Sequence, residues 1–271
     1  MVMVVSRETL AGLRVALPRL KSDDAIAAAL KTAGAQVDTF ALTQTIPIES
    51  EQLEQMRQRL ASGYYAWVVL SSWRAAQAVL AQLNALALAP ASAPTRLAVV
   101  GQSTAEWVNS HCALKPTLVG AGSAAKLLEV FPTPPTATTA AASTAATPTI
   151  CLPQSQLAAP TLAQGLSQLG WQVDAVATYT TVPLPQLPAH LKTQWQAGAW
   201  DAVVVTAGSS AQALLQLLGP PPEKTAVVSI GQSTTARCRE LGLRVDATAA
   251  TPRAEHITQA IINLFKAKDF S

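Results

Sequence analysis

Small hydroxyl side chains recur at four points of the sequence where a short apolar run ends. The runs are "WVVL", "LAVV", "AVVV" and "AVVSI", and the hydroxyl residues that follow them are Ser71, Ser72, Ser103, Thr104, Thr206, Ser209, Ser210, Ser233 and Thr234. Each group opens a segment with helical spacing, so it presents hydroxyl donors and free backbone N–H groups at a helix N-terminus. That arrangement suits the binding of carboxylates or phosphates.

Two of these groups belong to the same tetrapeptide, Gly-Gln-Ser-Thr, which occurs at residues 101–104 and again at 231–234. Serine and threonine are also favoured N-cap residues, so capping is the simpler interpretation for any single position. We expect the two GQST turns to face one cleft, and this favours a binding role for the pair.

The repeated turn is part of a longer internal repeat. The segment "LRVALPRL" is echoed by "PTICLPQS", "AGAQVDTFALTQTIPI" by "LGWQVDAVATYTTVPL", and "YAWVVLSSWRAAQAVLAQL" by "WDAVVVTAGSSAQALLQLL", before the two GQST turns follow in the same order. Chance likeness between alanine-rich helices does not explain the shared proline and glycine positions. The sequence therefore predicts two similar modules.

Each module has the pattern of an α/β domain. The apolar runs lack polar alternation, which is typical of parallel strands buried on both faces. Stretches with helical spacing lie between them, and Gly34, Gly170 and Gly242 are placed to end helices. We predict two similar doubly wound parallel-sheet domains, in which ligands bind beyond the carboxyl ends of the strands.

Composition excludes several function classes. Charged residues are 13% of the 271 residues and the formal net charge is +3, so we expect neither nucleic acid nor membrane partners. The sequence lacks GxGxxG after the first strand and lacks GxxxxGK[ST]. The three histidines lie outside the strand-end loops, which argues against a hydrolase.

Cysteine usage indicates the cellular compartment. Cys112, Cys151 and Cys238 are far apart and odd in number, so we expect buried thiols in a reducing compartment, the cytoplasm. No Cys/His spacing indicates a metal site.

In their order and spacing, several segments resemble the uroporphyrinogen-III synthase family. They are "VALPRL", "VVLSSWRAAQAV", "VVGQSTA", "ATYTTVP", "VVVTAGSSAQAL" and "SIGQSTTARCRELG", and the likeness runs from Leu13 to about Ile262.

The resemblance implies how the two domains are threaded. Domain 1 would be discontinuous in sequence, with residues 1–43 and 180–271, and domain 2 would span residues 44–179. A two-stranded linker would lie near residues 43–48 and 178–184, where Pro47 and Pro183 suit an exposed ribbon. The Pro/Thr/Ala-rich segment 132–149 has the composition of a flexible surface loop.

The resemblance also implies the reaction, which belongs to tetrapyrrole biosynthesis. Linear hydroxymethylbilane, which carries eight carboxylates, would be closed to uroporphyrinogen III with inversion of its last pyrrole ring. The family needs no metal and no organic cofactor. Closure without inversion is also chemically available, so the enzyme must mainly control the shape of its substrate.

For the site, the resemblance singles out Tyr179, which matches the family's tyrosine at the linker and would give a proton to the departing hydroxyl. Packing against the linker is the alternative. Arg19 matches the family's basic residue after the first strand and would meet a carboxylate, as would Arg74; a solvated surface charge is the alternative for both.

Other positions are weaker candidates or depart from the family. Solvation is the favoured interpretation for three further basic residues on helical stretches: Lys126, Arg237 and Arg253. Ala207 and Gly208 stand where relatives often have Ser-Pro, and Thr235 stands where alanine is usual. These departures leave the backbone role of the loops intact.

Two other functions stay open. A two-lobed protein that binds a small anion without chemistry has the same plan, and the fold is also compatible with a lost synthase activity. Because members of the family are usually monomers, we expect a monomer.

Overall fold

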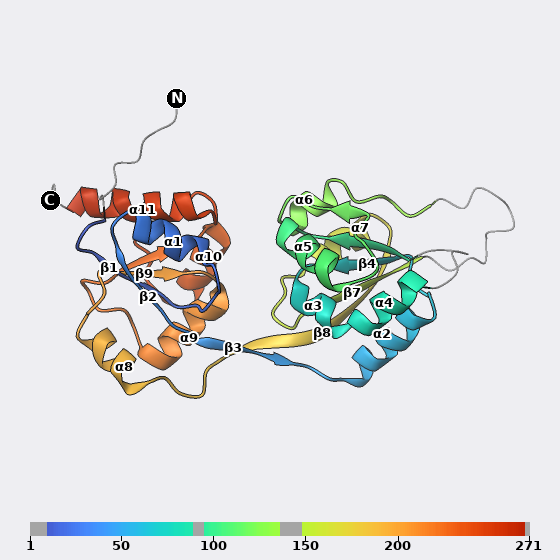
Figure 1. Ribbon diagram of the computed structural model, residues 1–271, viewed down its shortest axis with the longest axis horizontal. Helices are drawn as coiled ribbons and strands as arrows, with labels where there is room; N and C mark the ends of the chain where they lie inside the picture. The colour runs from blue at the N-terminus through green and yellow to red at the C-terminus, as the bar shows by residue number, and fades with distance from the viewer. Residues whose placement is uncertain (1–9, 89–94, 136–147, 269–271) are drawn as a thin grey trace, which may run out of the picture. The chain divides into compact units, whose positions relative to one another are not determined.

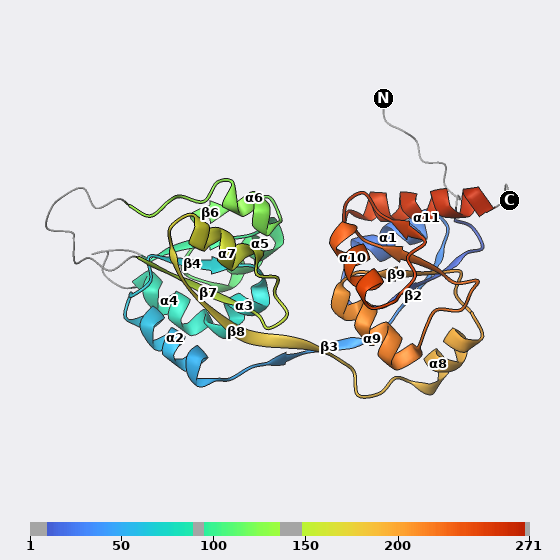
Figure 2. The ribbon, with the colours of Figure 1, turned by 180° about the vertical axis from the view of Figure 1, so that it is seen from behind.

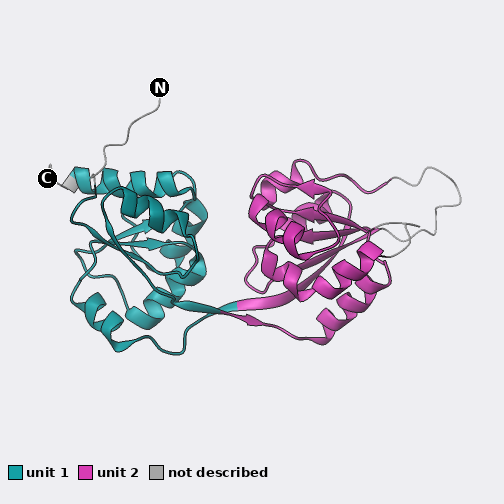
Figure 3. Cartoon of the chain, in the orientation of Figure 1, with its two compact units in different colours: residues 1–44, 181–271 teal, residues 45–180 magenta. Residues whose placement is uncertain are grey.

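The computed structural model describes residues 10–88, 95–135 and 148–268, which form two compact units. Unit 1 consists of residues 1–44 and 181–271, and unit 2 consists of residues 45–180 (Figure 3). The two-domain α/β fold with mainly parallel sheets is confirmed. The sequence-based bounds, 1–43 with 180–271 and 44–179, lie one residue from this division.

Unit 1 is built on five parallel strands in the order β11-β10-β9-β1-β2. Figure 1 labels β1, β2 and β9 of this sheet. The strands are β1 (Arg14–Leu17), β2 (Gln36–Thr39), β9 (Ala202–Val205), β10 (Ala226–Ser229) and β11 (Ala247–Thr248). The helices are α1 (Ala25–Thr32), α8 (Ala189–Gln196), α9 (Gly208–Leu218), α10 (Gln232–Glu240) and α11 (Ala254–Lys268). Helices α1 and α11 pack together on one face of the sheet, and α8, α9 and α10 cover the other.

Unit 2 has six strands in the order β3-β8-β7-β4-β5-β6. The strands are β3 (Thr43–Pro47), β4 (Trp67–Leu70), β5 (Arg96–Val99), β6 (Leu118–Val119), β7 (Thr149–Ser155) and β8 (Gln172–Pro183). The helices are α2 (Glu51–Ala61), α3 (Trp73–Ala78), α4 (Leu80–Leu88), α5 (Gln102–His111), α6 (Ala124–Leu128) and α7 (Thr161–Gln168). Helices α2 to α5 cover one face, and α6 and α7 cover the other (Figure 2).

The sequence repeat reappears as a repeated topology. Strands β2, β1, β9, β10 and β11 of unit 1 correspond in order to β8, β7, β4, β5 and β6 of unit 2. Strand β3 is an addition at the edge of the second sheet. It runs antiparallel to β8, because the Ile48 N–H donates to the Thr178 carbonyl while the Leu184 N–H donates to the Leu42 carbonyl.

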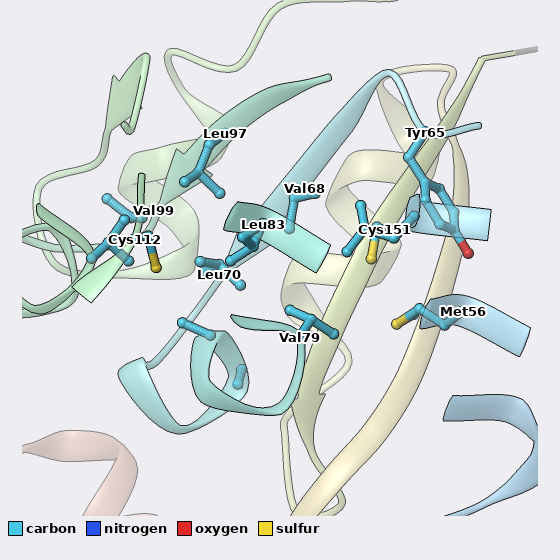
Figure 4. Packing of buried hydrophobic residues seen from close by; sticks show 14 of the residues in the cluster. Met56, Tyr65, Val68, Leu70, Val79, Leu83, Leu97, Val99, Cys112 and Cys151 are labelled. Atoms are coloured by element: carbon cyan, nitrogen blue, oxygen red, sulfur yellow. The ribbon is translucent and has the colours of Figure 1, made fainter. Parts of the chain in front are cut away.

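The apolar runs are strands buried on both faces, as predicted. All four residues of β4, of β9 and of β10 are buried. Side chains alternate between two cores: Val68 and Leu70 of β4 pack among the helices shown in Figure 4, whereas Trp67 and Val69 pack against α6 and α7. Burial of each large apolar side chain of these strands contributes roughly 1.5–3 kcal/mol to stability. The sheet is therefore the most strongly stabilised part of each unit.

The predicted helix ends are confirmed. Gly34 and Gly170 both have φ of +97°, and Gly242 has φ of +73°, a region that disfavours residues with a Cβ atom. After α1, the Gly34 N–H donates to the Lys31 carbonyl and the Ala35 N–H donates to the Leu30 carbonyl. The same pair of bonds follows α7 and α10, so all three helices end in a Schellman motif.

The predicted loop 132–149 falls largely outside the described residues, because residues 136–147 are not among them. Its last residue, Thr149, begins strand β7. Among the described helices, none combines the length and apolar character that crossing a bilayer requires.

The three cysteines are free and buried, as the sequence predicted. Burial raises the pKa of the Cys112, Cys151 and Cys238 thiols, so each carries less thiolate near neutral pH than an exposed cysteine does.

We therefore predict that the native protein resists thiol reagents. At pH 8, Ellman's reagent should release almost no chromophore over several minutes, and all three thiols should react once the chain is unfolded in guanidinium chloride. Fast reaction of any thiol in native protein would contradict this burial.

Candidate active site

The predicted hydroxyl residues all lie at the carboxyl ends of strands. Those of unit 2 follow β4 and β5, and those of unit 1 follow β9 and β10. In both sheets the strand order reverses beside the first strand of the repeat, at β1/β9 and at β7/β4. Ligands of doubly wound sheets bind at such a switch point.

Three of the helices that begin here have no side-chain cap. They are α5, α9 and α10, whose N-cap residues are Gly101, Ala207 and Gly231. Capping therefore does not account for the hydroxyl residues of their first turns. The exposed donors of an uncapped helix start are available to an anion.

Ser72 is the one predicted hydroxyl residue that caps a helix. Its Oγ atom accepts a hydrogen bond from the Ala75 N–H at 3.2 Å, at the start of α3. For Ser72 the capping interpretation is correct, although capping is not its only contact.

The hydroxyl residues differ in exposure. Ser71, Ser103 and Ser233 are exposed, and Ser72, Thr206 and Ser209 are half-buried. Thr104, Thr234 and Ser210 are buried, with 5%, 7% and 9% of their surface exposed. The exposed members are therefore the ones placed to meet a ligand directly, and a ligand contact at each position stays a prediction.

Thr235 uses its hydroxyl group inside unit 1. Its Oγ1 atom lies 2.7 Å from Oγ1 of Thr248 and also hydrogen-bonds to Ser229. The cluster joins β10, α10 and β11 directly behind the second GQST turn. Thr235, which stands where relatives usually have alanine, thus holds the second GQST turn in place by hydrogen bonds inside unit 1.

Tyr179 lies on β8, at an irregularity in the pairing with β7. Gln154 pairs with Ala177 but Ser155 pairs with Tyr179, so Thr178 is left over as a bulge. In a regular strand Tyr179 would point to the face opposite Val176. The bulge reverses the alternation, and both side chains pack against the same core.

The bulge brings Tyr179 to Ser72. The Tyr179 Oη and Ser72 Oγ atoms lie 3.0 Å apart, a hydrogen bond between residues 107 positions apart in sequence. Among the predicted site residues of unit 2, these are the two that the structure joins directly.

Tyr179 lines a groove of about 380 Å³ on unit 2. Trp73 and Arg74, from the first turn of α3, line it as well. The Arg74 guanidinium lies 4.5 Å from the Trp73 ring centroid and forms no ion pair with any described residue. A further arginine, Arg57, is bound to Glu49, and this hydrogen bond and charge lower the pKa of the Glu49 carboxyl.

Arg19 has a partner within unit 1 that the sequence did not reveal. Its guanidinium binds both carboxylate oxygens of Asp24, at 2.6 and 2.5 Å. Asp24 caps α1 by accepting the Ile26 N–H at 2.9 Å. Burial works to raise the pKa of Asp24, but the Arg19 hydrogen bond and charge outweigh it and lower the pKa. Arg19 therefore holds the loop after β1 in addition to any contact with a ligand.

Comparison with known proteins identifies the fold and the family. The family model described as uroporphyrinogen-III synthase HemD matches residues 24–259. The chain belongs to the uroporphyrinogen-III synthase family. The predicted enzyme class, a lyase that cyclises hydroxymethylbilane, is confirmed as the activity of this family.

Two solved structures share the fold. A mutant uroporphyrinogen III synthase from the extremely thermophilic bacterium Thermus thermophilus is 18% identical, with a TM-score of 0.58, and the match covers 94% of this chain and 99% of that one. The uroporphyrinogen-III synthetase from Helicobacter pylori is 14% identical, with a TM-score of 0.59, and the match covers 93% and 99%. No curated protein sequence matches the chain in a direct sequence comparison.

The remaining basic candidates of this synthase-family chain fall into two groups. Lys126 pairs with Glu129 and Arg237 pairs with Glu240 across one helical turn, as expected of solvated surface charges. Arg253 instead lines a pocket of unit 1, just before α11. Among the described residues, no group of His, Cys, Asp and Glu side chains has the arrangement of a metal site.

The two GQST glycines have different surroundings. A Cβ atom on Gly101 would lie 3.0 Å from the Gly122 Cα atom, so close backbone packing explains that glycine. A Cβ atom on Gly231 would meet nothing within 4 Å, and its φ of 166° is extended backbone that any residue adopts. Packing inside unit 1 therefore gives no reason for glycine at position 231.

We predict opposite effects of alanine at these two positions on stability. Gly101→Ala should lower the free energy of unfolding by about 1 kcal/mol or more, because the backbone at Gly122 must move. Gly231→Ala should leave it unchanged or raise it by up to about 1 kcal/mol, because alanine restricts the unfolded chain. Calorimetric melts of the two variants measure this difference. An equal loss of stability in both variants would show that Gly101 and Gly231 are packed alike.

Proposed function

We propose that the chain closes hydroxymethylbilane to uroporphyrinogen III, with Tyr179 as the acid that releases the substrate hydroxyl group. The 3.0 Å contact between Tyr179 and Ser72 carries this proposal, because it fixes a phenol at the wall of a groove at the carboxyl end of the sheet. The groove has room for part of a linear tetrapyrrole.

Ser72 orients the proton of Tyr179. In the direction that we propose for this bond, Ser72 Oγ accepts the Ala75 N–H and Ser72 donates its own hydrogen to Tyr179 Oη. The phenol proton then points away from Ser72 and toward the groove. Ser72 is thus a positioning residue, and Tyr179 is the catalytic one.

The proposed step conserves protons. Tyr179 gives its proton to the substrate hydroxyl, the C–O bond breaks, and water leaves behind an azafulvene cation. The Ser72 O–H group stabilises the phenolate that remains. The terminal pyrrole then attacks the azafulvene, and the macrocycle closes with that pyrrole inverted. The inverted pyrrole loses a proton, which returns to Tyr179.

Backbone N–H groups hold the substrate carboxylates in this proposal. On unit 2, the uncapped start of α5 offers such donors, with the hydroxyl group of Ser103. On unit 1, the uncapped starts of α9 and α10 offer them, with Ser209 and Ser233. Arg74 supplies a positive charge at the groove, where its side chain has no carboxylate partner among the described residues. Such donors fix the shape of a flexible chain and thereby exclude closure without inversion.

The setting of the reaction is also part of the proposal. We infer a cytoplasmic monomer that works without metal or organic cofactor and has no partner besides its substrate. The three buried free thiols support a reducing compartment. A two-lobed protein that only binds an anion is the alternative function.

The isomer assay separates synthase from binder. Hydroxymethylbilane is supplied to the purified chain, the product is oxidised, and the type III and type I isomers are separated. We expect mainly type III, whereas the spontaneous reaction gives type I. Only type I, at the spontaneous rate, would refute the synthase function.

We predict that Tyr179→Phe lowers kcat by about 10- to 100-fold, at or below the lower end of the roughly 10²- to 10⁴-fold that general acids contribute, because shape control remains. KM and the ratio of type III to type I should change little. Unchanged kcat would show that Tyr179 only packs against its neighbours.

Ser72→Ala should lower kcat several-fold through loss of the contact with Tyr179, and Ser72→Thr should restore most of it. Ser123→Ala is the matched control, because Ser123 caps α6 through the same bond, from the Lys126 N–H at 3.2 Å, and has no contact with Tyr179. Both alanine variants should lose about 1 kcal/mol of stability. Equal kcat in the two would contradict the positioning role.

A further inference from the structure

An open pocket of about 660 Å³ lies on unit 1, at the carboxyl ends of β1 and β10. Three cationic side chains line it: Arg19 and Lys21 from the loop after β1, and Arg253 from the residues before α11. We call it the Lys21–Arg253 pocket. It joins segments more than 200 positions apart in sequence, so the fold, not local sequence, assembles the charges.

The positive charge of this pocket is not balanced. Asp24 neutralises Arg19, and the lining includes one carboxylate, Glu255. Lys21 and Arg253 are exposed and form no ion pair with any described residue. The pocket thus keeps two cations free for an anionic ligand.

Apolar groups form the rest of the wall. Ile26 is buried, Ile230 is half-buried, and Pro252 is exposed. A cationic rim beside an apolar wall suits a flat ring that carries carboxylates at its edge, and suits a bare ion such as phosphate less well.

The loop after β1 has a conformation that its neighbours must hold in place. Asp23 has φ of +51°, and among the described residues no other non-glycine residue has a positive φ. Leu20, between Arg19 and Lys21, has 68% of its surface exposed. Backbone strain beside an exposed large apolar side chain is typical of a loop that contacts a ligand.

We propose that the Lys21–Arg253 pocket binds one pyrrole ring of the linear tetrapyrrole, with the two carboxylates of that ring paired to Lys21 and Arg253. The pyrrole ring lies against Ile26 and Ile230. The bidentate bond between Arg19 and Asp24 holds the wall of the pocket and leaves recognition to the other two cations. This inference rests on the proposed function.

The test measures steady-state formation of the type III isomer by the full chain, with hydroxymethylbilane varied. Lys21→Gln and Arg253→Gln should each raise KM about fivefold, the size expected for an exposed ion pair. The double variant should raise KM by about the product of the two effects. The kcat value should stay within twofold, and Lys21→Arg and Arg253→Lys should restore most of the affinity.

Matched controls remove the same charge elsewhere on unit 1. Lys31→Gln, near the end of α1, and Arg239→Gln, near the end of α10, should leave KM unchanged. Raising the salt concentration should weaken substrate binding more in the wild-type chain than in the double variant. If KM rises equally in the pocket variants and in the controls, the change in net charge alone accounts for the effect. That result would overturn the proposal.

Other outcomes also decide. Unchanged KM in the double variant, in a chain that forms type III isomer, overturns this inference and leaves the proposed function standing. No type III isomer from the wild-type chain refutes the proposed function, and the inference falls with it. Binding of millimolar inorganic phosphate that the double variant loses, with KM unaltered, would assign the pocket to a free oxyanion and overturn it as well.

Discussion

The direction of the parallel strands is the constraint on which the remaining structure depends. When neighbouring strands run the same way, all their carboxyl ends meet at one edge of the sheet, and the helices that follow must begin there. In both units, that edge collects uncapped helix starts and the hydroxyl residues of their first turns. A protein with few charged residues thereby gains a surface rich in fixed hydrogen-bond donors.

The two units share a topology but differ in the side chains at the carboxyl edges of their sheets. In unit 2, the bulge at Thr178 turns Tyr179 toward Ser72 and a groove that the Arg74 guanidinium also lines. In unit 1, the equivalent edge carries cations and an apolar wall, and its GQST turn is held from behind by the Ser229–Thr235–Thr248 hydroxyl cluster. Unit 2 has Val99 and Ala105 at the positions of Ser229 and Thr235, so its GQST turn lacks that support. The two units therefore share a scaffold, and individual side chains make them different.

Much of the scaffold was predictable because its signals are local. Unbroken apolar runs indicate buried strands, and Gly34, Gly170 and Gly242 end helices through bonds to the preceding turn. The candidate site was less predictable because its contacts are distant or irregular. No local signal marks a one-residue bulge at Thr178 or the bond of Arg19 to Asp24. Lys21 and Arg253 line one pocket only because the sheet of unit 1 brings distant segments together. The match of Tyr179 came from family resemblance, which carried information that residue spacing alone lacks.

The split of unit 1 around an uninterrupted unit 2 has a consequence for biosynthesis. Strands β1 and β2 leave the ribosome first, but β1 needs β9, whose residues emerge only after unit 2 is complete. Until then the early segment keeps apolar surface that it cannot bury, a state open to chaperones and to aggregation. Once folded, the inserted unit shortens the effective loop between the two halves of its host, because β3 and β8 bring residues 42 and 184 into hydrogen-bond contact. The sheet of unit 1 can therefore be completed only after unit 2 has been synthesised.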